Sequence, residues 1–137
     1  MLKTPLLHPE LLAALARSGH GSQILLADGN YPHSTGAPAR AERIHLNVAP
    51  GLLSVPDVLG PLLATVPIEA AAIMLTAQGA EAEIVAGYRQ QLPGVDFTGY
   101  ERFAFYEAAR REDVAVVIAT GEQRQYANLL LTIGVRT

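Results

Sequence analysis

The chain has 137 residues, of which 50% are apolar and 17% charged, with a formal net charge of −3 and no cysteine. A chain of this length suits one domain, residues 1–137, and hides roughly two-thirds of its unfolded surface when it folds. The lack of cysteine excludes disulfides and thiolate metal sites. The negative charge, without any block of Lys or Arg, argues against a nucleic-acid partner.

The charged fraction lies below the usual value of about a quarter, and the mean hydropathy is positive at +0.21. Such a chain has more apolar surface than one core easily hides, and exposed apolar patches usually mark interfaces. We therefore expect a homo-oligomer. The alternative is a monomer that is simply rich in Ala and Leu.

The N-terminal segment reads MLKTPLLHPELLAALARSG, and Pro5, Pro9 and Glu10 interrupt its apolar run. A signal peptide needs a continuous apolar stretch after its basic residues, so this segment fits one badly. No apolar run in the chain approaches the roughly 18 residues that a membrane span requires. These features predict a cytoplasmic protein with no membrane partner.

The first predicted element is a helix that begins at Pro9 and ends before Gly19. Pro is favoured in the first helical turn, and His8 just before it is expected to cap the helix. The apolar run QILLA (23–27) follows and predicts a short buried strand. The segment DGNYPHSTGAPA (28–39), rich in Gly, Pro and small polar residues, predicts a loop.

The next two segments predict a strand and a helix. RIHLNV (43–48) alternates apolar and polar residues, which indicates a half-buried strand with His45 on its open face. SVPDVLGPLLATV (54–66) begins with a Ser that can cap a helix. The Gly60-Pro61 pair is expected to kink this helix or split it.

The remainder of the chain continues the alternation of strands and helices. We predict a strand, two helices and two strands within AAAIMLT (70–76), EAEIVAGYRQQL (81–92), GYERFAFYEAARRE (99–112), VAVVIAT (114–120) and NLLLTIGV (128–135). The segment 114–120 shows no alternation, as expected of a strand covered on both faces. This order indicates a layered α/β domain with a mostly parallel sheet. The pattern does not reveal the strand order.

Two titratable side chains flank the predicted strand 23–27: His20 in a Gly-His-Gly turn before it, and Asp28 directly after it. Ligands of α/β folds collect where loops leave the carboxyl ends of strands, which favours Asp28 as a binding residue. An Asx turn is the alternative. His20 is either a general acid–base, because imidazole gives and takes protons at neutral pH, or a turn residue. A five-residue strand spans roughly 17 Å, so the two side chains meet only if the turn folds back or neighbouring subunits share a site.

The chain's histidines do not predict a metal site. His8, His20, His33 and His45 lie 12, 13 and 12 residues apart, which matches no compact ligand pattern. The chain also has no Gly-rich nucleotide fingerprint after a strand and no Gly-x-Ser-x-Gly elbow. Nucleotide binding and serine hydrolase chemistry are therefore unsupported.

Polar residues gather in the otherwise apolar C-terminal third of the chain, at Arg102, Glu107, Glu122, Tyr126 and Asn128. Arginine donors, a Tyr hydroxyl and an Asn amide are the groups that a polyhydroxylated ligand needs, because each sugar hydroxyl both donates and accepts. Each residue also has a structural alternative, as a surface ion pair, a packed aromatic ring or a turn residue.

Four segments, in this order and spacing, resemble the L-fucose mutarotase and D-ribose pyranase family: GHG after a short N-terminal helix, LLADGNYP, ERFAFYEAAR and TGEQRQYANLLLTIGV. The resemblance covers nearly the whole chain, and RFAFYE is similar to the fucose-mutarotase branch. It implies a three-layer α/β/α fold and subunits assembled as rings, typically decamers of stacked pentamers. It also implies an active site near subunit contacts, with no cofactor and no metal.

The resemblance implies roles for five residues. His20, in GHG, matches the proton donor of the family. Four residues match substrate-binding positions: Asp28, Arg102, Tyr126 and Asn128.

One departure from the family pattern affects substrate choice. The fucose branch usually carries a second histidine two residues after the aspartate, where this chain has Asn30, and the loop is one residue shorter before His33. The resemblance as a whole implies a cofactor-independent isomerase. We expect it to interconvert the anomers of an aldose such as L-fucose by acid–base ring opening and reclosure. Pyranose–furanose interconversion is a related activity. The alternatives are a non-catalytic sugar-binding module, a regulatory oligomer with a vestigial pocket, and an isomerase of another aldose.

Overall fold

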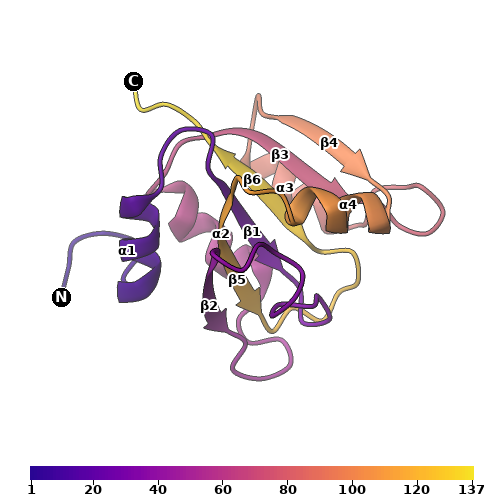
Figure 1. Cartoon of the computed structure of the whole chain (residues 1–137), viewed down its shortest axis with the longest axis horizontal. Helices are drawn as coiled ribbons and strands as arrows, with labels where there is room; N and C mark the ends of the chain where they lie inside the picture. The colour runs from indigo at the N-terminus through magenta and orange to yellow at the C-terminus, as the bar shows by residue number, and fades with distance from the viewer.

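The computed structural model describes residues 1–137 and contains four helices and six strands (Figure 1). In chain order these are α1 (Pro9–Arg17), β1 (Gln23–Ala27), β2 (Glu42–Leu46), α2 (Val55–Leu63), β3 (Ile68–Met74), α3 (Val85–Gln91), β4 (Asp96–Tyr100), α4 (Arg102–Ala109), β5 (Val114–Thr120) and β6 (Leu129–Ile133). None of the helices is long and apolar enough to cross a membrane.

The six strands form one sheet in the order β2-β5-β1-β6-β3-β4. Strand β6 is antiparallel to both of its neighbours, while the pairs β1–β5, β2–β5 and β3–β4 are parallel. The prediction of a mostly parallel sheet is therefore confirmed. Because β6 runs against the other five strands, its beginning lies at the edge where the others end.

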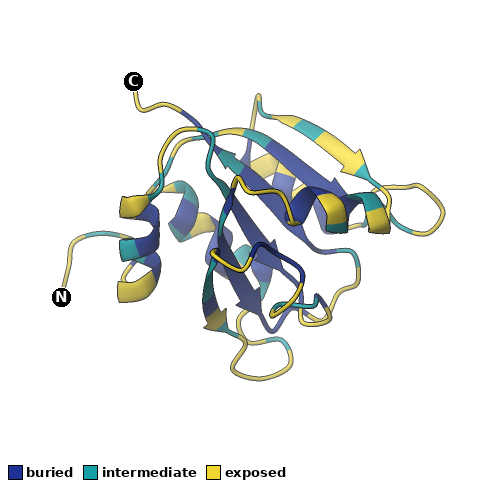
Figure 2. Ribbon diagram, in the orientation of Figure 1, coloured by how far each residue is buried: buried dark blue, intermediate teal, exposed yellow.

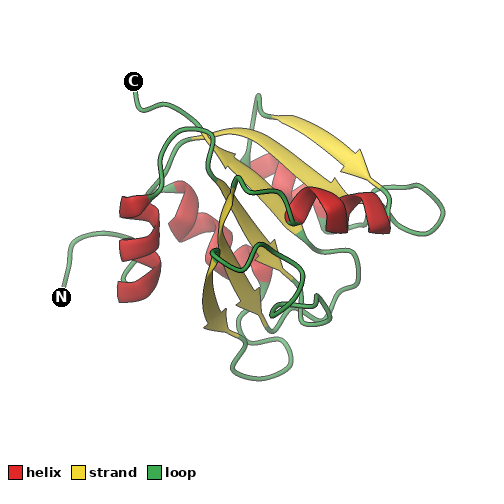
Figure 3. Ribbon diagram, viewed as in Figure 1, coloured by secondary structure: helices red, strands yellow, loops and turns green.

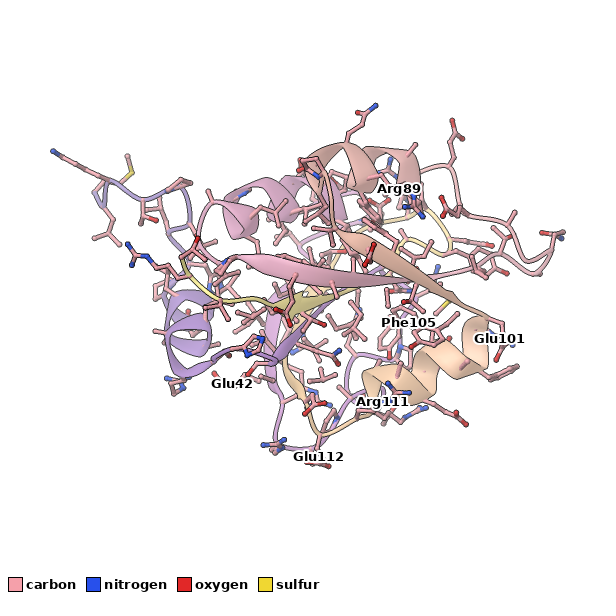
Figure 4. The ribbon with its side chains drawn as sticks, turned by 90° about the horizontal axis from the view of Figure 1, so that it is seen from above. Glu42, Arg89, Glu101, Phe105, Arg111 and Glu112 are labelled. Carbon is pink, nitrogen blue, oxygen red and sulfur yellow. The ribbon has the colours of Figure 1, made fainter.

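Helices cover both faces of the sheet, which confirms the three-layer α/β/α prediction (Figure 3). Helices α1, α2 and α3 pack on the face that carries Ile24 and Leu26 of β1. Helix α4 packs on the face that carries Leu25 and Ala27, together with the loop between β1 and β2. In Figure 4, Phe105 lies on the side of α4 that faces the sheet, and Glu101 lies where the helix begins.

The central strands are buried along almost their whole length (Figure 2). Six of the seven residues of β5 are buried, in agreement with its unbroken apolar sequence. Full burial of one Leu, Ile or Val side chain contributes about 1.5–3 kcal/mol. The centre of the sheet is therefore a stiff frame that carries loops at both of its edges.

Two helix beginnings agree with the sequence analysis. The Nδ1 atom of His8 accepts a hydrogen bond from the backbone N–H of Leu11 at 3.2 Å, so this histidine caps α1 as predicted. Ser54 and Asp57 form a reciprocal capping box at the beginning of α2.

Pro61 lies inside α2, two residues before its end, and the helix is not split. Of the two expected outcomes, a kink or a split, the split was wrong, because a proline removes only one N–H donor from the helix.

The predicted helix within 99–112 is confirmed as α4, which begins at Arg102. The edge strand β4, residues 96–100, was not predicted. The side chain of Glu101 accepts a hydrogen bond from the N–H of Ala104 at 2.7 Å and caps the helix. No residue of β4 is fully buried, so this strand lacks the apolar pattern from which strands are recognised.

Candidate functional site

The edge of the sheet where β1, β3 and β4 end gathers four of the five predicted site residues. Asp28 directly follows β1, Arg102 begins α4 just after β4, and the segment from Tyr126 to Asn128 leads into β6. These segments surround a hollow of about 350 Å³. The hollow is lined by Asp28, Asn30, Tyr31, Met74, Arg102, Tyr106, Gln125, Tyr126 and Asn128.

Asp28 and Asn128 form the buried floor of this hollow, and each is only 3% exposed. The side-chain oxygen of Asn128 accepts a hydrogen bond from the backbone N–H of Asp28 at 2.8 Å, and its amide nitrogen donates to Oδ2 of Asp28 at 3.0 Å. The other carboxylate oxygen accepts from the N–H of Asn30 at 3.0 Å. Both polar side chains therefore have a fixed orientation.

The surroundings of Asp28 change its acidity. Burial raises the pKa of its carboxyl group, while the hydrogen bond from the backbone N–H of Asn30 acts in the opposite direction. Desolvation disfavours the charged form of a carboxyl group, and N–H donors favour it. This carboxyl therefore binds a proton more readily than a solvent-exposed aspartate does.

Tyr126 enters the hollow from an unusual backbone conformation, with φ of 59°. Non-glycine residues with positive φ are uncommon and persist where their surroundings hold them. The buried Tyr88 of α3 holds the neighbouring residue, because its hydroxyl donates to the carbonyl of Ala127 at 2.7 Å. This bond fixes the turn that presents Tyr126 and Asn128.

One wall of the hollow is aromatic. The ring of Tyr31 lies 5.5 Å from that of Tyr106 and 6.4 Å from that of Phe105, both in edge-to-face geometry. The Tyr31 hydroxyl donates to the carbonyl of Gly36 at 2.7 Å, which leaves the ring as its contribution to the wall. An aromatic wall offers apolar surface to the C–H groups of a ligand.

Arg102 stands at the rim of the hollow as an exposed cation. Its guanidinium lies 4.6 Å from the ring centre of Phe103, and it forms no ion pair with a carboxylate of the chain. Its donors are therefore free for a ligand with several oxygen atoms.

His20 lies away from this hollow. It precedes β1 whereas Asp28 follows it, and a five-residue strand separates their backbones by about 17 Å. His20 lies beside a different hollow of about 330 Å³, together with Ser22, Arg40 and Glu112. The turn does not fold back, so a single chain does not bring His20 to the other four predicted residues.

Two other acidic residues that the sequence analysis singled out, Glu107 and Glu122, do not line this hollow. Glu122 is buried, accepts hydrogen bonds from Arg124 at 2.8 Å and from the N–H of Val55 at 3.3 Å, and so links this loop to the beginning of α2. These bonds lower the pKa of Glu122 to about 2, with the Arg124 side chain as the main cause. Glu107 is exposed on α4.

The sequence analysis did not single out some residues of the hollow. Tyr106 follows Arg102 by one helical turn, and this spacing was a usable signal. Met74 and Gln125 carried no signal, because they reach the hollow only through the pairing of β3 with β6 and the turn before β6. The histidines and acidic residues form no group of three that could hold a metal ion.

The fold and the hollow define a small α/β protein with a polar pocket suited to a polyhydroxylated ligand. Residues 1–136 match the RbsD / FucU transport protein family. The chain belongs to this family.

Individual proteins similar to this chain are consistent with its membership of the family. A fucose mutarotase from Bos taurus is 38% identical over 143 residues, which cover 95% of this chain and 90% of the relative. The fucose mutarotase of Streptococcus pneumoniae, solved in complex with L-fucose, is 30% identical with a TM-score of 0.84. The RbsD protein of Bacillus subtilis, solved with D-ribose, is 26% identical with a TM-score of 0.86. Both structures match over 100% of this chain and of their own.

Proposed function

We propose that this protein is a monosaccharide mutarotase, an isomerase that interconverts the anomers of an aldose. The observation that carries the proposal is the hollow at the carboxyl edge of the sheet, where Asp28, Arg102, Tyr126 and Asn128 converge. Their carboxylate, guanidinium, hydroxyl and amide groups supply both donors and acceptors for sugar hydroxyls. The similarity to the two fucose mutarotases supports the same reaction.

The reaction opens and closes the sugar ring. An acid gives a proton to the ring oxygen while the bond from this oxygen to C1 breaks, and its electron pair stays on the oxygen. The electrons of the O–H bond at C1 form the aldehyde carbonyl, and the released proton passes to water. The aldehyde group turns about the C1–C2 bond and closes in the reverse steps, so no other reactant is consumed.

In our proposal His20 is the acid, and it comes from a neighbouring copy of the chain. Asp28 and the other three residues hold the sugar hydroxyls in the hollow of one subunit. The distance along β1 prevents His20 of the same chain from reaching that sugar. The spontaneous reaction already proceeds, so acid–base catalysis worth about 10² to 10⁴-fold is sufficient.

The assembly we propose is a ring of subunits, with the decamer of two stacked pentamers as the expected form in the cytoplasm. Large apolar side chains exposed on the single chain support an assembly, since such side chains usually mark interfaces. Three of them, Val48, Leu52 and Leu53, lie in the loop after β2. Phe103 is 61% exposed beside the hollow itself.

The preferred sugar is L-fucose or D-ribose in our proposal. The aromatic helix beginning RFAFYE and the 38% identity to the bovine enzyme favour L-fucose. Asn30, which lines the hollow, gives this wall a neutral amide in place of a titratable ring.

The experiment is anomer exchange measured by saturation-transfer NMR on L-fucose and D-ribose. The wild-type chain should accelerate exchange of one of them, and His20→Ala should lower the catalysed rate by at least about 100-fold. His45→Ala, on the exposed face of β2, is the matched control and should keep the wild-type rate. Undiminished exchange in His20→Ala would refute the assignment of the acid.

A non-catalytic sugar-binding protein is the second candidate. The separation of His20 from the hollow within one chain favours it, because binding needs no titratable group at that position. Sugar binding by the wild-type protein without faster exchange would select this function.

A further inference from the structure

The long loop between β1 and β2, residues 28–41, supplies part of the hollow that we propose for the sugar. Asp28, Asn30 and Tyr31 of this loop line the hollow, and the loop contains no helix or strand. Loops of this length without regular structure are uncommon in compact domains and are usually functional. Its backbone carbonyls have no helix or sheet ladder to bond to, so its shape depends on side chains that bond to it.

The guanidinium of Arg43 in β2 supplies these bonds. It donates to five backbone carbonyls of the loop: Nε to His33 at 3.1 Å, Nη1 to Pro38 at 2.8 Å and to Ala41 at 2.9 Å, and Nη2 to Ser34 at 3.4 Å and to Ala37 at 3.1 Å. A guanidinium carries five N–H donors. All of its donors are therefore used on this one loop.

The positive charge of Arg43 is held by carbonyl oxygens alone. Arg43 forms no ion pair with a carboxylate of the chain. By contrast, Arg17 of α1 pairs with Glu42, the residue before Arg43, at 2.6 Å. A planar fork of five donors is specific to arginine, whereas lysine presents three donors from a single nitrogen. The loop is thus built around a guanidinium and not around positive charge in general.

Two contacts connect the loop that Arg43 holds to the hollow. Nε2 of His33 donates to the carbonyl of Asp28 at 2.8 Å, while the carbonyl of His33 accepts from Arg43. The hydroxyl of Tyr31 donates to the carbonyl of Gly36 at 2.7 Å. A Cβ atom at Gly36 would lie 2.6 Å from Cε1 of Tyr31, so the loop backbone lies directly against this ring. A change in the shape of the loop therefore displaces both the aromatic wall and the backbone of Asp28.

We propose that Arg43 is a positioning residue for the sugar site. It does not line the hollow itself, and it acts by folding residues 33–41 into the shape that presents Tyr31 and Asp28 to the ligand. These two residues hold the sugar before and during ring opening in our proposal, so loss of Arg43 weakens binding more than it slows the chemical step. The inference rests on the proposed function, because it takes the hollow as the place where the sugar binds.

Three variants of the full-length protein test this role. Arg43→Met removes all five donors and keeps an unbranched side chain. Arg43→Lys keeps the charge and offers three donors. Arg17→Met is the matched control, because it removes an arginine that bonds to the neighbouring residue of β2 and makes no bond to the loop.

The first test measures hydrogen–deuterium exchange of the backbone amides of residues 31–41 by mass spectrometry. The N–H groups of Tyr31, His33 and Gly36 donate to carbonyls within the loop, so their exchange reports on its opening. Exchange in this segment should be at least about tenfold faster in Arg43→Met, and faster by a smaller factor in Arg43→Lys. Arg17→Met should exchange at the wild-type rate. Wild-type exchange in either Arg43 variant overturns the inference, and if Arg43→Met does not fold, Arg43→Lys decides.

The second test measures binding and catalysis with L-fucose and D-ribose. Calorimetry gives Kd, and saturation-transfer NMR at several sugar concentrations gives kcat and KM. For the sugar that the wild type binds, Arg43→Met should raise Kd and KM at least about tenfold with kcat within about threefold, Arg43→Lys should raise both less, and Arg17→Met should change neither.

Two results of this second test would overturn the positioning role. One is a wild-type Kd in Arg43→Met or in Arg43→Lys, and the other is a loss confined to kcat. If the wild type binds the sugar without faster exchange, the mutarotase proposal is wrong, and the Kd values still decide whether Arg43 shapes the site.

Discussion

Asp28 and Asn128, which stand 100 positions apart in the chain, exchange two hydrogen bonds at 2.8 and 3.0 Å. The contact exists because β1 and β6 are antiparallel neighbours, so the residue after one strand meets the residue before the other. The amide of Asn128 donates to a side chain and accepts from a backbone N–H at the same time. The carboxylate of Asp28 therefore has a fixed orientation in the free chain.

Replacing this amide by an acid should destabilise the fold. Asn128→Asp exchanges a donor for a second carboxylate oxygen and places two buried acids in contact. At pH 8 we expect the free energy of unfolding to fall by about 1–3 kcal/mol. At pH 5 the loss should shrink, because one of the two carboxyl groups takes up a proton. Urea denaturation at the two pH values measures both effects.

Asn47→Asp is the control for this substitution, since Asn47 is exposed just after β2. Surface changes of this kind usually alter stability by less than about 0.5 kcal/mol. Equal losses for the two variants would contradict the role of the buried pair.

The acids Asp28 and Glu122 should give opposite pH dependence of stability. Burial raises the pKa of Asp28, so its contribution is fully present below the unfolded value of about 3.9 and is lost as the pH rises through the folded pKa. Arg124 lowers the pKa of Glu122 to about 2, so its contribution is present above the unfolded value and is lost as the pH falls toward 2.

These signs predict the behaviour of two variants in urea denaturation between pH 2 and pH 7. Asp28→Asn should gain stability relative to the wild type as the pH rises from 4 to 7. Glu122→Gln should be less stable than the wild type at pH 7 and should approach it near pH 2. Parallel trends in the two variants would show that the assigned causes are wrong.

Removing the Tyr88 hydroxyl should loosen the sugar site from a distance. Tyr88→Phe leaves the carbonyl of Ala127 without its buried donor, and we expect a loss of about 1–3 kcal/mol in unfolding free energy. KM for the sugar should rise more than kcat falls, because Tyr126 and Asn128 bind the ligand in our proposal. Steady-state kinetics and urea denaturation measure the two effects. Tyr100→Phe removes a half-buried hydroxyl that has no hydrogen bond in the chain, and it should change neither.

Two inactive variants should restore activity to each other if subunits share the site. Chains with His20→Ala and chains with Asp28→Asn are co-expressed in equal amounts and purified as mixed assemblies. In random head-to-tail contacts about a quarter of the sites combine an intact His20 with an intact Asp28, so about a quarter of wild-type exchange should return. Mixed assemblies as inactive as the single variants would show that the site does not cross between chains.

The sequence was most informative where burial leaves a strong pattern. The unbroken apolar run of β5 and the position of Asp28 after β1 were enough to predict the layers and one residue that lines the hollow. The resemblance in RFAFYE and QYANLLL supplied Arg102, Tyr126 and Asn128, all of which line the same hollow.

Other features depended on contacts that no local pattern reveals. The edge strand β4 has the sequence DFTGY and remains largely exposed, so neither periodicity nor apolar content predicted it. Met74 and Gln125 reach the hollow through the order of strands in the sheet. The contact of the His20 ring with the carboxylate of Glu69 at the beginning of β3, at 3.1 Å, likewise required the position of β3 beside β6.

Strand β1 lies in the middle of the sheet and cannot bend to bring its two ends together. A solitary protomer can therefore grip a sugar yet leave it unconverted, if the acid arrives from a neighbour as we propose. Dilution would then abolish activity by dissociating the assembly before the chain unfolds. A newly synthesised chain would become active only after it binds other subunits. Self-association would then control the activity of the chain.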